Sequence, residues 1–207
     1  MRLYIDIETI PSDTPPTRAE LLKALPGTIK KQETIDKWLE ENEHLVWQKE
    51  SLNSMKGNIC SIAWAFDDED IQVSTGTEEV VLDSLFTSIK NKLGKNTPSI
   101  IDWVGHNILG FDLPFIFHRS LIVCPQFTNL IQKDKRNVYD TMKLWNPWDY
   151  RNFTGLKDIA NFLGLEVREE TGAAIWDLWN TEEFDTIKEY NKHDVHLTRE
   201  IFKMIQD

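Results

Sequence analysis

The sequence has few cysteines and no long apolar run. Its 207 residues include two cysteines, Cys60 and Cys124, whose separation fits neither a disulfide framework nor a metal motif. We therefore expect two reduced, buried thiols in a cytoplasmic protein. No stretch approaches the roughly 20 apolar residues that a membrane-spanning helix needs. Arg2 is followed by only three apolar residues before Asp6, so no secretory signal is predicted.

Positive charge is also scarce. Lysine and arginine total 23 against 34 acidic residues, which gives a net charge of −11. A protein that coats the phosphate backbone of nucleic acid by itself should be basic, so this balance argues against such a binder. It permits an enzyme that handles an anion through metal ions. The 41% hydrophobic content is that of a globular chain, and the length suits a single domain over residues 1–207.

The hydrophobic pattern alternates between strand and helix periods. It predicts strands at 2–10 and 99–105 and a hairpin over 58–66 and 71–76. Residues 11–57, with a proline-rich start, predict a mostly helical insertion after the first strand. Further helices are expected between Thr77 and Gly94, at 112–120, at 155–165 and at 182–206 with Thr181 as its N-cap, while 138–145 fits a strand or a helix. Such interleaving predicts an α/β sheet.

The first strand carries two carboxylates inside an apolar run. In RLYIDIETIP, residues 2–11, the side chains of Asp6 and Glu8 point to the same face because strand side chains alternate. Tyr4 and Ile10 share that face and are not typical of a solvated edge. Two buried carboxylates roughly 7 Å apart are costly unless a cation compensates them. The pattern therefore favours a functional pair over a solvated strand face.

The last helix and the 105–115 segment repeat the anomaly. Asp194 interrupts an apolar stripe of helical spacing, and Tyr190 lies one turn before it on the same side. Asp112 follows a strand end in GHNILGFDLPF, where it fits a helix N-cap with Pro114 in the first turn. Strand ends are also where ligands bind in α/β sheets, so Asp112 suits both roles.

Together these residues resemble the three motifs of the DEDD superfamily of 3′–5′ exonucleases. The motifs are Asp6-x-Glu8, then Asn107 and Asp112 in HNILGFD, then Tyr190-x-x-x-Asp194. With tyrosine at position 190, the third motif resembles that of the tyrosine subclass, which includes the proofreading domains of family B DNA polymerases. The histidine subclass would need histidine at position 189, where this chain has glutamate. The 11–57 insertion looks like that of standalone exonucleases related to those domains.

The resemblance implies a fold and a mechanism. The fold is the ribonuclease H-like one, a central mixed β-sheet flanked by helices. The activity is removal of nucleoside 5′-monophosphates from the 3′ end of single-stranded nucleic acid, with DNA favoured. Two Mg²⁺ or Mn²⁺ ions would be held by four catalytic carboxylates, Asp6, Glu8, Asp112 and Asp194. Tyr190 would also be catalytic, as the residue that orients the attacking water.

The sequence also contains candidate contacts for a substrate and for partners. Asn107 is a candidate substrate contact, or a residue whose side chain hydrogen-bonds to the backbone at the strand end. Lys133, Lys135 and Arg136 are candidate phosphate contacts, against the alternative of a solvated basic cluster. The expected partner is a single-stranded 3′ end, with a replication or repair complex as a further candidate and no membrane. Tryptophans spaced three apart suit the core better than base stacking.

Other classes of function stay open. A ribonuclease H-like module without catalysis is disfavoured because all four carboxylates and the tyrosine are present. A metal-dependent endonuclease of the same fold is disfavoured by Tyr190, and an Asp-x-Asp phosphatase by glutamate at position 8. His193 and His196 beside Asp194 do not predict zinc, since no third nitrogen or sulfur ligand is apparent. A nuclease that works only inside a complex fits the acidic charge.

Overall fold

A computed structural model describes residues 1–94, 101–131, 135–149, 151, 153–168 and 172–206. Its sheet has the order β3-β2-β1-β4-β5. The central strand β1 pairs antiparallel with β2, which pairs antiparallel with β3, and β1, β4 and β5 run parallel. The sheet is therefore mixed. Its strands are β1 (Arg2–Pro11), β2 (Gly57–Phe66), β3 (Gln72–Thr75), β4 (Asp102–Gly105) and β5 (Val138–Asp140).

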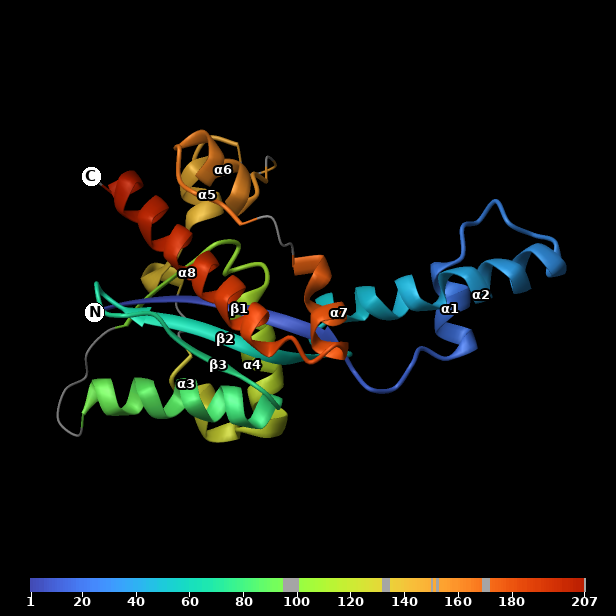
Figure 1. Cartoon of the computed structure of the whole chain (residues 1–207), viewed down its shortest axis with the longest axis horizontal. Helices are drawn as coiled ribbons and strands as arrows, with labels where there is room; N and C mark the ends of the chain where they lie inside the picture. The colour runs from blue at the N-terminus through green and yellow to red at the C-terminus, as the bar shows by residue number, and fades with distance from the viewer. Residues whose placement is uncertain (95–100, 132–134, 150, 152, 169–171, 207) are drawn as a thin grey trace.

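Helices cover both faces of this sheet (Figure 1). The long helix α8 lies on one face, and α3 and α4 lie on the other. The short helices α5 and α6 lie beside the C-terminal half of α8, and α1 and α2 project beyond the end of β1. The helices are α1 (Arg18–Ala24), α2 (Gln32–Lys49), α3 (Glu78–Leu93), α4 (Asp112–Val123), α5 (Thr141–Trp145), α6 (Leu156–Phe162), α7 (Ile175–Asn180) and α8 (Phe184–Gln206), with 3₁₀ turns at Glu50–Leu52, Pro125–Asn129, Lys135–Asn137 and Gly172–Ala174.

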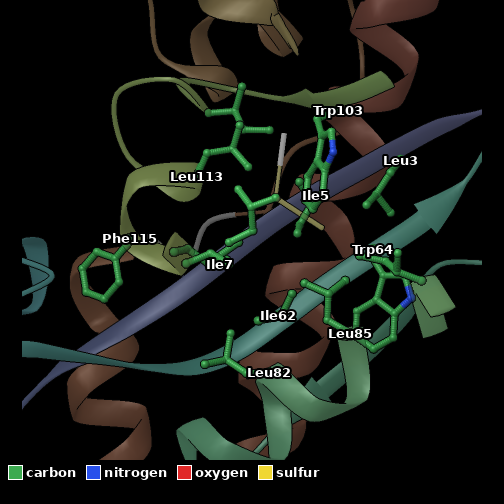
Figure 2. Close-up of a cluster of buried hydrophobic side chains, with 14 of the residues drawn as sticks. Leu3, Ile5, Ile7, Ile62, Trp64, Leu82, Leu85, Trp103, Leu113 and Phe115 are labelled. Carbon is green, nitrogen blue, oxygen red and sulfur yellow. The ribbon is translucent and has the colours of Figure 1, made fainter. Parts of the chain in front are cut away.

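The two faces of β1 belong to separate hydrophobic clusters. Leu3, Ile5 and Ile7 pack with side chains of β2, α3 and α4 in the largest cluster, which Figure 2 shows. Tyr4, on the opposite face, packs with Val195 and Phe202 of α8. The strand is thus buried on both sides, as expected of the centre of a sheet with helices on each face. Asp6 and Glu8 lie on the α8 face.

The architecture expected from the sequence is confirmed. The sheet is mixed, helices flank it, and a helical insertion follows the first strand, as in the ribonuclease H-like fold. The segment 138–145, which fitted either a strand or a helix, contains both in succession, β5 and then α5. Within the described parts of the chain, no helix is long and apolar enough to cross a bilayer.

Two helix starts differ from the prediction. Thr181 does not cap α8 but ends α7, where its hydroxyl donates to the carbonyl of Asp177 at 3.0 Å. Helix α7 itself was not predicted because it spans only six residues. Asp112 is the first residue of α4 rather than its N-cap, which is Phe111.

Candidate active site

Strand β1 and helix α8 bring three carboxylates together. Asp6, Glu8 and Asp194 each offer an oxygen that lies within 4.8 Å of the other two. Glu8 and Asp194 are each only 8% exposed. The cluster arises because alternate residues of β1 face α8, and α8 crosses that face with Asp194 turned toward the strand. The motif residues on β1 and α8 therefore meet in space.

The fourth predicted carboxylate, Asp112, lies beside this group rather than within it. The pairing between β4 and β1 stops at Tyr4, because β4 ends at Gly105. Later N–H groups of β1 on the β4 side therefore have no partner in that strand. The Asp112 carboxylate accepts one of them, the N–H of Ile7, at 3.2 Å. Asp112 is 3% exposed, and its charge raises the pKa of both Asp6 and Glu8.

Burial raises the pKa of every one of these carboxyl groups. Burial is the largest cause for Asp6 and Glu8, whose pKa values lie well above their ordinary range, and neighbouring carboxylates add to it. Burial raises the pKa of Asp112 to about 7 and that of Asp194 to about 6. The protein thus concentrates negative charge where its own groups disfavour ionisation, as expected of a site built for cations.

Tyr190 and Lys157 lie next to the carboxylate cluster. Tyr190 is 5% exposed and hydrogen-bonds to Asp194. Burial, followed by the nearby carboxylates, raises its pKa above the usual value of about 10, so the phenol stays protonated at neutral pH. Lys157 of α6 lies over the Tyr190 ring, 5.2 Å from its centroid, and its positive charge lowers the pKa of Glu8 and Asp194.

A buried polar chain holds Asp6 in place. The Asn191 side chain, fully buried on α8, donates from Nδ2 to Asp6 Oδ2 at 2.6 Å. The hydroxyl of Ser61 on β2 donates to Asn191 Oδ1 at 2.9 Å, and Thr75 Oγ1 on β3 lies 2.9 Å from the same hydroxyl. The chain crosses three strands and one helix, and it fixes both the amide orientation and the carboxylate that Asn191 contacts.

A further buried carboxylate, that of Asp140, positions the loop before α4. Asp140, 3% exposed at the end of β5, accepts from the backbone N–H groups of Asn107 and Leu109 at 2.9 and 3.3 Å. Asn107 adopts a left-handed conformation with φ +56°, which asparagine tolerates better than most residues. Its side chain lies so close to Gly110 that a Cβ there would meet Asn107 Oδ1 at 2.4 Å. Asn107 thus shapes the turn that delivers Asp112.

The predicted basic contacts are not brought to the carboxylates. Lys135 and Arg136 are exposed and precede β5, level with the start of β1, whereas Asp6 and Glu8 lie farther along β1. Lys133 lies outside the described residues. Among the described residues, His193 and His196 are not part of a three-ligand cluster of histidine, cysteine or acidic groups. Cys60 and Cys124 are buried and are not joined in a disulfide, as expected.

Sequence reasoning missed Asn191, Lys157 and Asp140 as parts of the site. Asn191 contacts a residue 185 positions away, and Asp140 contacts a loop more than 30 positions away. Lys157 read as one of many polar residues on a short amphipathic helix. A signal was present only for Asn191, an uncharged polar residue that lies three positions, about one helical turn, before Asp194.

The donor set fits hard divalent cations. All three clustered side chains offer carboxylate oxygens, the ligands that Mg²⁺ and Mn²⁺ prefer. Asp194 Oδ1 is buried, and among the residues that the structure describes it has no hydrogen-bond partner. A buried charged oxygen without a partner is costly, and a cation would supply that partner.

The fold and this carboxylate site define the class of protein, and a family model identifies the group within it. The model of a predicted 3′–5′ exonuclease related to the exonuclease domain of PolB matches residues 52–206, about three quarters of the chain. The chain therefore belongs to this family. No curated protein matches it.

Among solved structures, the chain is similar to the family B DNA polymerase from the hyperthermophilic archaeon Pyrobaculum calidifontis. The two share 15% sequence identity with a TM-score of 0.59. The match covers 95% of this chain but only 23% of the polymerase, so the chain spans about a quarter of that protein. At this identity the likeness establishes a shared fold.

Proposed function

We propose that this protein is a metal-dependent 3′–5′ exonuclease of the tyrosine subclass. It would hydrolyse phosphodiester bonds at the 3′ end of single-stranded nucleic acid, with DNA favoured, and release nucleoside 5′-monophosphates. The observation that carries the proposal is the convergence of Asp6, Glu8 and Asp194 within 4.8 Å, with Tyr190 hydrogen-bonded to Asp194. Family membership supports the same reaction.

The four carboxylates would hold two divalent cations, Mg²⁺ or Mn²⁺. Asp6, Glu8 and Asp194 form one ligand group, and Asp112, placed beside Asp6 but apart from the group, suits a second ion held with the help of Asp6. When bound, two such ions lower the pKa of an attacking water and stabilise charge on the phosphoryl oxygens. The carboxylate cluster alone would repel a phosphodiester.

Tyr190 and Lys157 would then act on water and phosphate. A phenol that stays protonated near a carboxylate can donate to Asp194 or to a water, so Tyr190 orients the attacking water instead of removing its proton. Lys157 places an ammonium group beside the same carboxylates, where it would contact a nonbridging phosphate oxygen. Both groups are fixed by helices, which favours a pre-organised geometry.

The acidic surface bears on partners. A net charge of −11 gives little general attraction for nucleic acid, so a companion protein in a replication or repair complex would add to substrate binding. Under that second candidate function, the isolated chain is a nuclease with weak activity that a complex restores.

A time course on 5′-labelled single-stranded DNA and RNA of one sequence tests the proposal. Wild type and Asp6→Asn are run with Mg²⁺, with Mn²⁺ and with chelator. We expect a ladder that shortens from the 3′ end, requires metal and disappears in the variant. Internal cuts would indicate an endonuclease. Absence of cleavage in every condition would overturn activity of the isolated chain and leave the complex-dependent enzyme to be tested with added partners.

A further inference from the structure

An aromatic hollow lies next to the carboxylate site. It has a volume of about 410 Å³, within the range of roughly 300–1,000 Å³ of small-ligand sites. Its walls come from the end of β1, from α2 and from α7. The lining residues are Ile10, Pro11, Ser12, Asp13, His44, Trp47, Trp176, Trp179 and Asn180. Three indoles and one imidazole in a single hollow are more than packing of a surface loop requires.

The hollow continues directly from the site along β1. Ile10 is two residues beyond Glu8, roughly 7 Å along a strand. Ile10 and Trp176 pack in the same hydrophobic cluster as Tyr190, the residue hydrogen-bonded to Asp194. A base attached to a phosphate at the carboxylates therefore has an aromatic hollow within one or two nucleotides of chain.

The aromatic walls are held in place before any ligand binds. The His44 ring stacks on Trp176 at 4.5 Å, and Trp47 meets Trp176 edge-on at 5.1 Å. The Trp47 indole donates to the carbonyl of Ser12 at 2.9 Å. His44 and Trp47 lie on α2 of the helical insertion and, like β1, precede the residues 52–206 that the family model matches. The insertion thus adds these walls to a site whose carboxylates come from β1 and α8.

We propose that this hollow, named here the insertion pocket, binds one nucleobase of the single strand whose phosphate lies at the carboxylates. The proposal rests on the proposed function. It also explains how an acidic protein would hold its substrate, because stacking on aromatic rings needs no positive charge. The Asp13 carboxylate offers hydrogen-bond acceptors, so the pocket should favour bases with an amino group, such as cytosine, over thymine.

Binding of fluorescent single-stranded DNA tests the pocket separately from cleavage. The Asp6→Asn background keeps the oligonucleotide intact, and a single abasic residue is placed at each of the last three positions in turn. We expect one position at which loss of the base weakens binding about 5- to 150-fold, the range for one stacked base. Trp179→Leu should weaken binding of the intact strand by a similar factor.

The two losses should not add. If the base stacks in the insertion pocket, Trp179→Leu weakens the intact strand but adds little once that base is absent. His44→Ala, a change at an exposed residue, provides the same comparison if Trp179→Leu folds poorly. Trp148→Ala is the matched control, since Trp148 is 94% exposed and lies outside the pocket. Additive losses, or equal losses in the control, would overturn the pocket.

Base preference and activity complete the design. With cytosine against thymine at the sensitive position, wild-type binding should differ about fivefold, and Asp13→Ala should abolish the difference; an unchanged difference overturns the role of Asp13. If wild type degrades DNA but no position is sensitive, the pocket fails and the proposed function stands. If a sensitive position exists but nothing is degraded, the pocket stands and the proposed function of the isolated chain fails.

Discussion

The two faces of β1 are buried to similar extents but contain opposite chemistry. On one face Leu3, Ile5 and Ile7 pack with apolar side chains and need nothing further. On the other, Asp6 and Glu8 meet Asp194 under α8, and burial and repulsion raise their pKa values. One strand thus contains a complete core and a site that its own residues leave electrostatically incomplete. The comparison separates what stabilises the fold from what awaits a ligand.

The largest expected effect is on the carboxylate face. Asp6→Asn should lower the exonuclease rate by about 10³-fold or more, because losing cation-mediated charge stabilisation costs several kcal/mol. The free energy of unfolding in chelator should stay equal or rise, since one buried like charge is removed. Single-turnover cleavage and denaturant unfolding measure the two quantities. An active variant with full metal dependence would contradict the assignment.

The opposite result is expected one residue away. Ile5→Ala should lower the free energy of unfolding by about 2–5 kcal/mol, because the fully buried side chain leaves a cavity in the largest cluster. Its rate per folded molecule should stay near that of wild type. Urea unfolding and cleavage at a temperature where the variant is folded check both statements. Loss of rate equal to that of Asp6→Asn would mean that the two faces are not functionally separate.

Tyr190→Phe should have an intermediate effect. It removes the hydroxyl that hydrogen-bonds to Asp194 but keeps the ring in its cluster. We expect a rate about 10- to 100-fold lower, the worth of one hydrogen bond to a charged group, with little change in cation affinity. Rapid-quench kinetics and calorimetry are the measurements. A variant as fast as wild type would remove Tyr190 from the mechanism.

Asn191→Ala tests the support of the carboxylate face. Asp6 would lose the donor at 2.6 Å, so its pKa should rise further and divalent cations should bind about tenfold more weakly. Asn161→Ala, an exposed asparagine on α6, is the matched control. Mn²⁺ titration followed calorimetrically gives both affinities. Equal affinities in the two variants would show that the Asn191 contact does not position Asp6.

The last expected effect concerns the pH dependence of stability. The folded pKa values of Asp112, about 7, and Asp194, about 6, exceed the usual unfolded value near 4, so the folded state binds more protons between these limits. Stability in chelator should therefore fall as pH rises from 5 to 8, by about 2–4 °C in Tm per kcal/mol lost. Saturating Mn²⁺ should reduce or reverse the trend. A Tm in chelator that rises over this range would contradict the burial of charge.

The periodic pattern of the sequence was sufficient to predict which side chains of β1 and α8 share a face. The alternation of β1 and the stripe on α8 placed Asp6, Glu8, Tyr190 and Asp194 correctly, because strand and helix periods fix which side chains share a face. The same reasoning could not find Asn191 or Asp140, whose partners lie far away in sequence. It also misplaced Thr181, because a threonine suits the end of one short helix as well as the start of the next.

Calorimetric titration of Mg²⁺ and Mn²⁺ into wild type and Asp6→Asn tests most directly whether cations complete the α8 face of β1. The account predicts saturable binding of two ions to wild type. Protons should be released at pH 6–7, because the carboxyl groups with raised pKa values ionise when they bind the ions. Asp6→Asn should lose at least one of the two ions. No saturable binding to wild type, or identical binding to both proteins, would contradict the account.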